Sequence, residues 1–568
     1  MADDTPSLNF TSPKGGAYGG FFSTTGLEPN VQAVMMNYRW TADAQGAQAA
    51  KSLTYYFPTA SSDYTTNVNY PEAALLSSFT PLNSFEQKAA RAAFDLVSSY
   101  TNLTFKAAAT GQGSDATFRF AKYSDKGSEA NFPTNNGNYN PIDARAAGDI
   151  FLGNNGTIST DAFYGTDQFN TIMHEMGHAF GLKHGHDGKY NGALDPSVND
   201  NEFSVMTYSS WMGTPDGALT LARDGSSPQS YMMYDISALQ AYYGANFSKV
   251  GTTSIYKWDP TGKEWLNGAL APDTGTSSTN KILTTIWTGG ATATYDFSNY
   301  NENGNYDLRP GKWSTFSSAQ LADLNSKADA NTTEYQAQGN VYNALLYNKD
   351  TRSEISNIVV GNGNDKIMGN DLSNFITLGT GNDTVDGAGG INTVSLSGIK
   401  SNYNVNNNNG TITVTALSPI SGGIDTLTNI QQIKFADITT VYDLTSANDQ
   451  SIYLLYKAAF GRMPDNAGFR YWATTADVNK LPILSIAENM VGSNEFTSKY
   501  GSNIDNQQYV AELYTNVLGR PADVAGATFW LDNLNNGMGR DQVLVAFAQS
   551  PENVSLTGQH MTDGYWTI

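Results

Sequence analysis

The spacing of apolar residues predicts strands and helices over the first part of the chain. Short apolar or alternating runs, the pattern of strands, occur at residues 52–58, 116–124 and 146–153. Apolar residues recur at helical spacing over residues 84–105, a segment that ends in a strand, and over residues 167–182, where Gly181 is placed to end the helix. These patterns predict an α/β domain over residues 28–246. The Gly-, Ser- and Thr-rich residues 1–27 are expected to form a loose N-terminal extension or pro-segment.

Beyond residue 246 the pattern changes three times. Residues 247–355 carry short apolar alternations among Thr, Gly and Asn, which predict a β-rich connecting region. Residues 356–444 contain a nine-residue period followed by short strands, and residues 445–568 return to helical spacing. Since the chain is also too long for one hydrophobic core, we expect a multidomain protein. Its parts would be an α/β domain, a parallel β-roll or β-sandwich domain and an all-α C-terminal domain.

Four consecutive nine-residue blocks cover residues 360–395. Each has an aliphatic residue at its eighth position, and these residues are Ile367, Ile376, Val385 and Val394. The blocks fit G-G-x-G-x-D-x-U-x, in which each block forms a glycine turn and a short strand of a calcium-binding β-helix. Because turns on the same side are two blocks apart, Asp365 and Asp383 are expected to bind Ca²⁺ with carbonyl oxygens near Gly361, Gly363, Gly379 and Gly381. A run of hairpin turns without metal is the alternative.

Composition narrows the chemistry. The chain has 568 residues, no cysteine and a formal net charge of −21. The lack of cysteine excludes disulfides, thiolate metal sites and a cysteine nucleophile, and the acidic balance disfavours nucleic acid and anionic membranes as partners. No stretch approaches the roughly 18 apolar residues of a membrane span. The first 20 residues also lack the basic and apolar regions of a signal peptide.

Candidate catalytic chemistry is concentrated in HEMGHAFGLKH, residues 174–184. His174 and His178 are four residues apart on the predicted helix, so they can share one metal ion. Gly181 lets the chain leave the helix sharply and bring His184 round as a third ligand. Three imidazoles leave positions on zinc open for water and substrate, as a catalytic site requires. The alternative is a helix with incidental surface histidines, but three of only five histidines in the chain occupy these positions.

Three further residues belong to the predicted site. Glu175 is rotated about 100° from His174 around the helix, so it can face a water molecule and not the metal. Met206 and Tyr208 follow His184 by 22 and 24 residues. Met206 is expected to pack as a floor beneath the metal, and Tyr208 to direct its phenol towards the metal.

Residues 28 to about 400 resemble the serralysin family, bacterial metzincin proteases followed by a calcium-binding RTX β-roll. The segments that carry the resemblance are AVMMNYRW, LTYYFP, GTDQFNTIMHEMGHAFGLKH, FSVMTY and YMMYDISALQAYYGAN. The resemblance implies an α/β zincin (metzincin) catalytic domain, with Tyr208 as a movable additional zinc ligand and Glu175 as the general base. It implies zinc bound by His174, His178 and His184. It also implies a substrate antiparallel to an edge strand, expected here at AAGDIFL, residues 146–152.

Two parts of the chain depart from the serralysin pattern. The family usually has a proline after the third ligand, where this chain has Gly185 and His186, and His186 is expected to be a surface residue. Residues 445–568 resemble a helical repeat of unassigned function found at the ends of secreted bacterial proteins. Six residues recur 58 positions later, which predicts two copies of a helix, a Gly-Arg turn capped by Asp, and an aromatic-bearing helix. The first copies are Tyr456, Gly461, Arg462, Asp465, Gly468 and Trp472.

These observations predict a secreted metalloendopeptidase that hydrolyses protein substrates, with one catalytic Zn²⁺ and structural Ca²⁺. Because low-affinity calcium sites fill outside the cell, we expect export by the signal-peptide-independent type I route that the RTX resemblance implies. Expected partners are protein or peptide substrates and, through the helical segment, surface-layer or other cell-surface proteins. The alternative is a calcium-dependent cell-surface or S-layer-associated binding protein whose zinc site is idle.

Overall fold

The computed structural model describes most residues of the chain. These are residues 14–44, 46–64, 75–109, 113–124, 127–133, 146–153, 157–212, 220–223, 225–271, 279–325, 335–417, 422–444, 446–557 and 566–567.

The chain forms two compact units, each described by itself. The first consists of residues 1–374 and 388–390, and the second of residues 375–387 and 391–568. The prediction of a multidomain protein with many strands followed by C-terminal helices is confirmed. The five segments expected from the sequence stay a prediction as separate domains.

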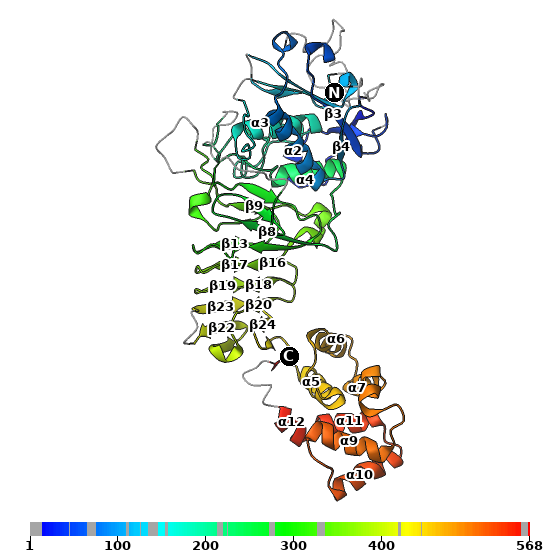
Figure 1. The fold of residues 1–568 in the computed structure, drawn as a ribbon. Helices are drawn as coiled ribbons and strands as arrows, with labels where there is room; N and C mark the ends of the chain where they lie inside the picture. Colours follow the sequence, from blue (N-terminus) through cyan, green and yellow to red (C-terminus); the bar gives the residue numbers. More distant parts are fainter. Residues whose placement is uncertain are drawn as a thin grey trace. The chain divides into compact units, whose positions relative to one another are not determined.

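A five-stranded sheet forms the frame of the first unit (Figure 1). Its strand order is β4-β3-β5-β7-β6, and all neighbours are parallel except β6, which runs antiparallel to β7. The strands are β3 (Ser52–Tyr56), β4 (Thr104–Ala107), β5 (Phe118–Lys122), β6 (Glu129–Ala130) and β7 (Asp149–Leu152). The predicted strands at residues 52–58, 116–124 and 146–153 are therefore confirmed.

Two long helices pack with this sheet. Helix α2 (Ser84–Tyr100) begins at Asn83, whose side chain accepts hydrogen bonds from two backbone amides while Glu86 closes a capping box. Its buried face, which includes Ala89 and Phe94, joins the main hydrophobic core. Helix α3 (Asp167–Phe180) carries the histidine motif and is capped by Thr166. Shorter elements of this region are β1 (Tyr18–Phe21), α1 (Pro29–Ala33), β2 (Tyr38–Thr41) and α4 (Met233–Tyr243).

The edge of the sheet differs from the expectation. AAGDIFL contains β7, but this strand is internal because Glu129 and Ala130 of β6 pair with it at Phe151 and Ile150. The edge strand is therefore β6. A two-residue strand with no apolar run gives almost no periodic signal, so the sequence pattern did not reveal it.

The expected loose N-terminal extension is also corrected from Lys14 onward. The Lys14 ammonium is buried and lies 2.6 Å from the carboxylate of Asp149, which Arg119 also pairs with. Strand β1 pairs antiparallel with β2. This part of the segment is thus integrated into the first unit through a buried ion pair and a strand pair. Residues 1–13 lie outside the described residues.

The rest of the first unit is β-rich, as predicted. Strand β12 runs parallel to β8 on one side and to β16 on the other, and β13 pairs in parallel with β17. The strands are β8 (Thr253–Trp258), β9 (Glu264–Leu266), β10 (Ala269–Leu270), β11 (Thr284–Ile286), β12 (Thr292–Asp296), β13 (Asn305–Asp307), β14 (Trp313–Ser314), β15 (Val341–Asn343), β16 (Ile355–Val359) and β17 (Lys366–Met368).

The second unit begins with two layers of short strands. In one layer β18, β20 and β24 are parallel neighbours, and in the other β19 is parallel to β23. The aliphatic residues Ile376, Val385 and Val394 are buried, as the nine-residue period predicts. The strands are β18 (Phe375–Thr377), β19 (Thr384–Asp386), β20 (Thr393–Ser395), β21 (Tyr403–Asn408), β22 (Thr411–Ala416), β23 (Ile424–Thr428), β24 (Gln432–Lys434), β25 (Thr439–Val441) and β26 (Trp566–Thr567).

Helices complete the second unit (Figure 1). The two predicted copies correspond to α5 with α6 and to α9 with α10. Gly461 and Gly519 each end the first helix of a copy with a φ of 67°, and Asp465 and Asp523 each cap the second. The helices are α5 (Ala447–Phe460), α6 (Asn466–Asp477), α7 (Ile483–Val491), α8 (Asn494–Tyr500), α9 (Asn506–Leu518), α10 (Val524–Asn535), α11 (Arg540–Ala548) and α12 (Pro551–Thr557). Within the described part of the chain, we find no helix with the length and apolar character needed to cross a bilayer.

Candidate metal centre

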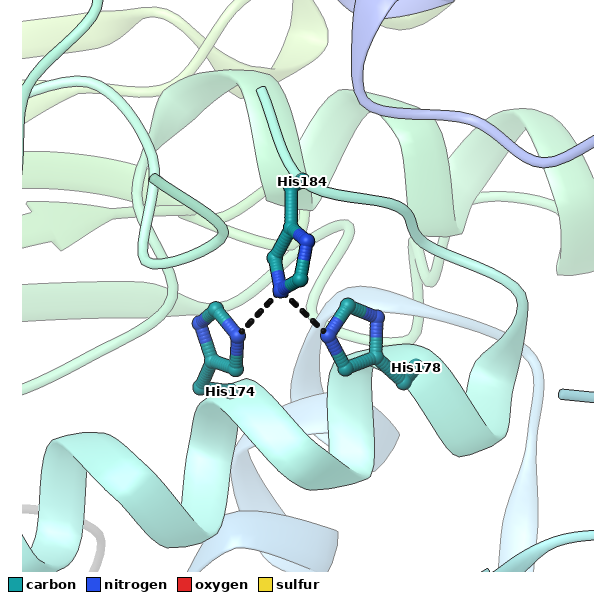
Figure 2. Close-up of side chains that lie close together, drawn as sticks. All are labelled: His174, His178 and His184. Carbon is teal, nitrogen blue, oxygen red and sulfur yellow. Dashed lines mark hydrogen bonds between the residues drawn. The ribbon is translucent and has the colours of Figure 1, made fainter. Parts of the chain in front are cut away.

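Three imidazoles converge at one point in the first unit (Figure 2). His174 and His178 project from the same side of α3, one turn apart, and His184 approaches from the segment after the helix. The Nε2 atom of His184 lies 3.0 Å from Nε2 of His178 and 3.2 Å from Nε2 of His174. The structure therefore brings together the three predicted ligands.

Hydrogen bonds orient these rings. The Nδ1 of His174 donates to the carbonyl of Val205 at 2.7 Å, and the Nδ1 of His178 donates to the carbonyl of Leu182 at 2.8 Å. Because a carbonyl oxygen can only accept, Nδ1 carries the proton and Nε2 presents its lone pair. Burial lowers the pKa of His174 to about 4 and of His178 to about 3, and burial also lowers the pKa of His184. Neutral imidazole is the form that binds metal.

The spacing of the nitrogens fits zinc. Two ligands about 2.0–2.1 Å from a tetrahedral zinc ion lie about 3.3 Å apart. The measured separations of 3.0 and 3.2 Å are close to this value. Three lone pairs turned towards one another are also unfavourable unless a cation lies between them.

Gly181 makes the turn after α3 possible. Its φ of 106° lies in the left-handed region that favours glycine, and a Cβ there would lie 2.1 Å from the carbonyl oxygen of Tyr38. The last carbonyls of the helix are bound by side chains from elsewhere in the unit, since Trp40 donates to Ala179 and Tyr243 to Phe180. The predicted helix end is thus confirmed.

A buried lysine holds the loop that carries His184. The Nζ of Lys183 donates to the carbonyls of Asp187 at 2.6 Å and Gly192 at 2.9 Å, and also to those of Ala33 and His184. Burial lowers the pKa of Lys183 to about 8. These contacts tie the loop that follows the third histidine to Ala33, so Lys183 positions His184.

The floor of the site is anchored by α4. The carboxylate of Asp235 accepts hydrogen bonds from the Ser204 hydroxyl at 2.6 Å and the Val205 amide at 2.7 Å. Val205 in turn accepts the proton of His174, so Asp235 acts on the first histidine through one residue. Met206 is fully buried, and a Cβ at Gly177 would lie 2.4 Å from its Sδ. Met206 therefore packs directly under the histidine helix, where the floor was predicted.

Glu175 is buried beside the histidines. Burial raises the pKa of its carboxyl to about 8, and the negative charge of Glu129 on β6 acts in the same direction. Its Oε2 is buried without a hydrogen-bond partner among the described residues. A buried carboxylate oxygen of this kind is suited to a partner that arrives with substrate or water.

Tyr208 and His186 lie next to the third ligand. The ring centroid of Tyr208 is 4.4 Å from that of His184 and 5.9 Å from that of His174. His186 is half-buried and stacks on His184 with an interplanar angle of 11°. It is not one of the three converging residues. It was expected to lie at the surface, but it is only partly exposed.

A cavity of about 290 Å³ opens beside Glu175 and Tyr208. Its walls include the apolar side chains of Leu152, Ile158 and Ile172. A cavity of roughly 300–1,000 Å³ lined mainly by apolar groups is typical of a ligand site. Two of its charged residues, Lys122 and Glu86, belong to no motif in the sequence.

The predicted calcium ligands occupy glycine turns. In the first unit, Gly361 and Gly363 approach the carbonyl oxygens of Tyr300 and Glu302 so closely that no side chain could be accommodated, and the buried Asp365 accepts from the Gly304 amide at 2.7 Å. In the second unit, Gly379 and Gly381 precede the buried Asp383, whose amide donates to Asp425. Since Asp365 and Asp383 belong to different units, their shared site stays a prediction.

Comparisons with known proteins agree with this geometry. The family model described as Matrixin matches residues 75–198. Serralysin C of Dickeya chrysanthemi is 35% identical over 153 residues, which cover 25% of this chain and 29% of that protein. The part of the first unit that matches the Matrixin model is thus similar to serralysins. Metalloprotease AprA of Pseudomonas entomophila is 27% identical over 318 residues, covering 53% of this chain and 56% of that protein.

The serralysin-like resemblance is thus confirmed for part of the chain. Serralysin of Proteus mirabilis is 28% identical over 214 residues, covering 36% of each protein. The chain spans little more than half the length of these relatives at most. A model described as a domain of unknown function matches residues 487–557, within the helices of the second unit, and the role of these helices is unassigned.

Proposed function

We propose that the chain is a zinc-dependent endopeptidase that hydrolyses peptide bonds of protein substrates. The observation that carries the proposal is the convergence of three Nε2 atoms beside a buried carboxylate and an open cavity. His174, His178 and His184 would hold the ion. When bound, zinc supplies a Lewis acid and lowers the pKa of water.

The residues of this chain would then have distinct roles. Glu175 would take a proton from the attacking water at its carboxylate and pass it to the leaving amine. Tyr208 would donate its phenol proton in a hydrogen bond to the oxyanion of the substrate, and would also serve as the movable ligand. Strand β6 would bind the extended substrate antiparallel along the edge that faces away from β7.

The test uses Glu175→Gln in the full-length, zinc- and calcium-loaded protein. Gln preserves the shape of the side chain but cannot accept the proton, so the rate of casein cleavage should fall by roughly 10²–10⁴-fold. Metal analysis should still find about one zinc ion per chain. Asp161→Asn is the matched control, because this exposed carboxylate lies in the same unit and forms an ion pair with Lys88 at the surface.

The binding-protein alternative makes a different prediction. An idle site would hold zinc without cleaving casein, and a chelator would change nothing but stability. Normal turnover by Glu175→Gln would refute the assigned base, whereas a wild-type protein that holds zinc and cuts no protein would refute the endopeptidase.

We further propose that calcium stabilises the glycine turns and that the protein acts outside the cell after type I export. Asp365 and Asp383 are buried carboxylates in glycine turns, and the carboxylate and carbonyl oxygens of such turns are donors that suit Ca²⁺. In the second unit, Asp425 is a further carboxylate against the turn of Asp383. Calcium near millimolar concentration, as found outside cells, would fill such sites. The surface-layer partner of the helices stays a prediction.

A further inference from the structure

The cavity beside Glu175 lies on one definable side of a bound substrate. A chain antiparallel to β6 runs parallel to β7, because β6 and β7 are antiparallel. The cavity is lined by Leu152 and Gly153 at the end of β7 and by Gly127 and Ser128 just before β6. Both groups lie where the C-terminal part of the substrate would pass. The cavity therefore receives the P1′ side chain, which directly follows the cleaved bond.

An ion pair lines this cavity. The Nζ of Lys122, from β5, lies 2.7 Å from Oε1 of Glu86, from the first turn of α2. Their side chains are 14% and 5% exposed, so both are largely withdrawn from water. The second oxygen of Glu86 accepts a hydrogen bond from the Asn83 amide at 2.8 Å. Among the described residues, the Nζ of Lys122 has besides only a long contact of 3.4 Å to the Thr157 hydroxyl.

The ion pair carries no net charge, and it disfavours the binding of a charged P1′ side chain. A basic P1′ side chain would meet Lys122 and would have to compete with it for Glu86. An acidic P1′ side chain would meet Glu86 and compete for Lys122. Separating a buried pair leaves one charge without its partner, which costs more than a neutral ligand does. The apolar walls at Leu152, Ile158 and Ile172 favour a large neutral side chain instead.

We propose that Lys122 and Glu86 are specificity-determining residues that restrict P1′ to large uncharged side chains such as Leu, Met or Gln. This inference rests on the proposed endopeptidase function. It assigns to the ion pair a role in choosing the substrate, apart from the zinc and its histidines.

The experiment measures kcat/KM for peptides that differ only at P1′, which is Leu, Glu or Lys. The wild-type protein should prefer Leu by about tenfold or more over either charged residue. Glu86→Gln should raise kcat/KM for the Glu peptide relative to the Leu peptide about tenfold, because Lys122 then lacks its carboxylate partner. Gln at this position retains the capping box of α2. Lys122→Met should raise the Lys peptide in the same way, since Glu86 then lacks its cation.

Lys88→Met is the matched control, because its ion pair with Asp161 is exposed and outside the cavity. Its P1′ profile should equal that of the wild type. The inference is supported if Glu86→Gln improves cleavage of the Glu peptide and Lys122→Met improves cleavage of the Lys peptide. It is overturned if active variants show the wild-type P1′ preference or change it in the same direction, and the proposed endopeptidase function is then unaffected. If the wild-type protein cuts none of the peptides and no casein, the endopeptidase itself fails. Binding of the same peptides to Glu175→Gln gives the order of preference without turnover, and no preference there also overturns the inference.

Discussion

The histidine region of the first unit and the helical copies of the second use polar side chains in opposite ways. Around the histidines, Lys183 and Asp235 are buried and bind several backbone groups each. In the helical copies, Arg462 and Glu495 form a pair at 2.7 Å with side chains 40% and 48% exposed, and Arg520 and Glu552 repeat it at 2.7 Å.

The difference shows two roles of polar side chains, since the buried ones fix the backbone around the site and the exposed ones lie in turns between helices. A buried polar group loses hydration, so it remains only where its bonds fix a backbone that must not move. The exposed arginines of the copies follow a glycine that ends one helix and precede the Asp that caps the next, so they lie in the turn between the two helices. We therefore expect substitutions in the first set to affect metal binding and stability together, and those in the second set to affect neither much.

The largest effect is expected for Lys183→Met. Four carbonyls would lose a charged donor, so the free energy of unfolding should fall by about 3 kcal/mol and zinc affinity by about 10–100-fold. Urea unfolding and chelator competition measure the two quantities. Lys189→Met, at an exposed lysine of the same loop, is the control and should change neither. A variant that lost stability but kept full zinc affinity would break the link between this lysine and His184.

Calcium should have the next largest effect, on the second unit. Burial and the charge of Asp383 raise the pKa of Asp425 to about 7, so folding without calcium favours the protonated carboxyl. Stability should therefore fall as the pH rises from about 4 to about 7. Calcium binds the ionised form, so it should stabilise the protein more at pH 8 than at pH 5. At pH 8 a calcium concentration a hundredfold above Kd should add about 2.7 kcal/mol to the free energy of unfolding.

Thermal melts at the two pH values, with and without calcium, measure this effect. Asp425→Asn should remove most of the pH dependence. An equal calcium effect at both pH values would contradict a carboxylate site.

Asp235→Asn should have a smaller effect, about 2 kcal/mol. The amide oxygen can still accept from the Val205 and Met232 amides, but the NH₂ group would then replace the oxygen that accepts from the Ser204 hydroxyl, so this bond and the negative charge are lost. Because Val205 holds the His174 ring, zinc affinity should fall as well. Denaturant unfolding and zinc titration check this, and stability loss with unaltered zinc binding would reduce Asp235 to a packing role.

The smallest effect is expected for Arg462→Gln. Exposed ion pairs contribute at most about 1 kcal/mol and often nothing measurable. The melting temperature should be nearly unchanged, in low salt and in 1 M salt alike. A large shift would show that the copies depend on this pair, and the contrast with the histidine region would collapse.

The same contrast explains what the sequence predicts. The helix of the histidine motif, its end at Gly181 and the two helical copies are visible because each depends on residues within a few positions of one another. The three ligands follow from spacing for the same reason, whereas Met206 lies 22 residues beyond His184 and is predicted from the longer motif. The calcium roles of the glycine turns are not yet tested.

Other features depend on distant partners and leave no local pattern. Lys183 reaches back to Ala33, and Asp149 is paired with Lys14, so neither network is visible in one stretch of sequence. The pairing of β6 with β7 moves the edge of the sheet away from AAGDIFL, and β6 is too short for a period. The ion pair of the cavity joins a strand to a helix 36 residues away.

The last strand of the chain has a practical consequence. Strand β26 returns to pair with β25, and Trp566 stacks on Tyr453 at 4.3 Å and donates to the Leu444 carbonyl. The helices α5 to α12 therefore lie, in the sequence, between two strands that are hydrogen-bonded neighbours. A fluorophore or affinity tag placed just after Trp566 would lie beside β25 and report on the strands, whereas one inserted before α10 would report on the helices.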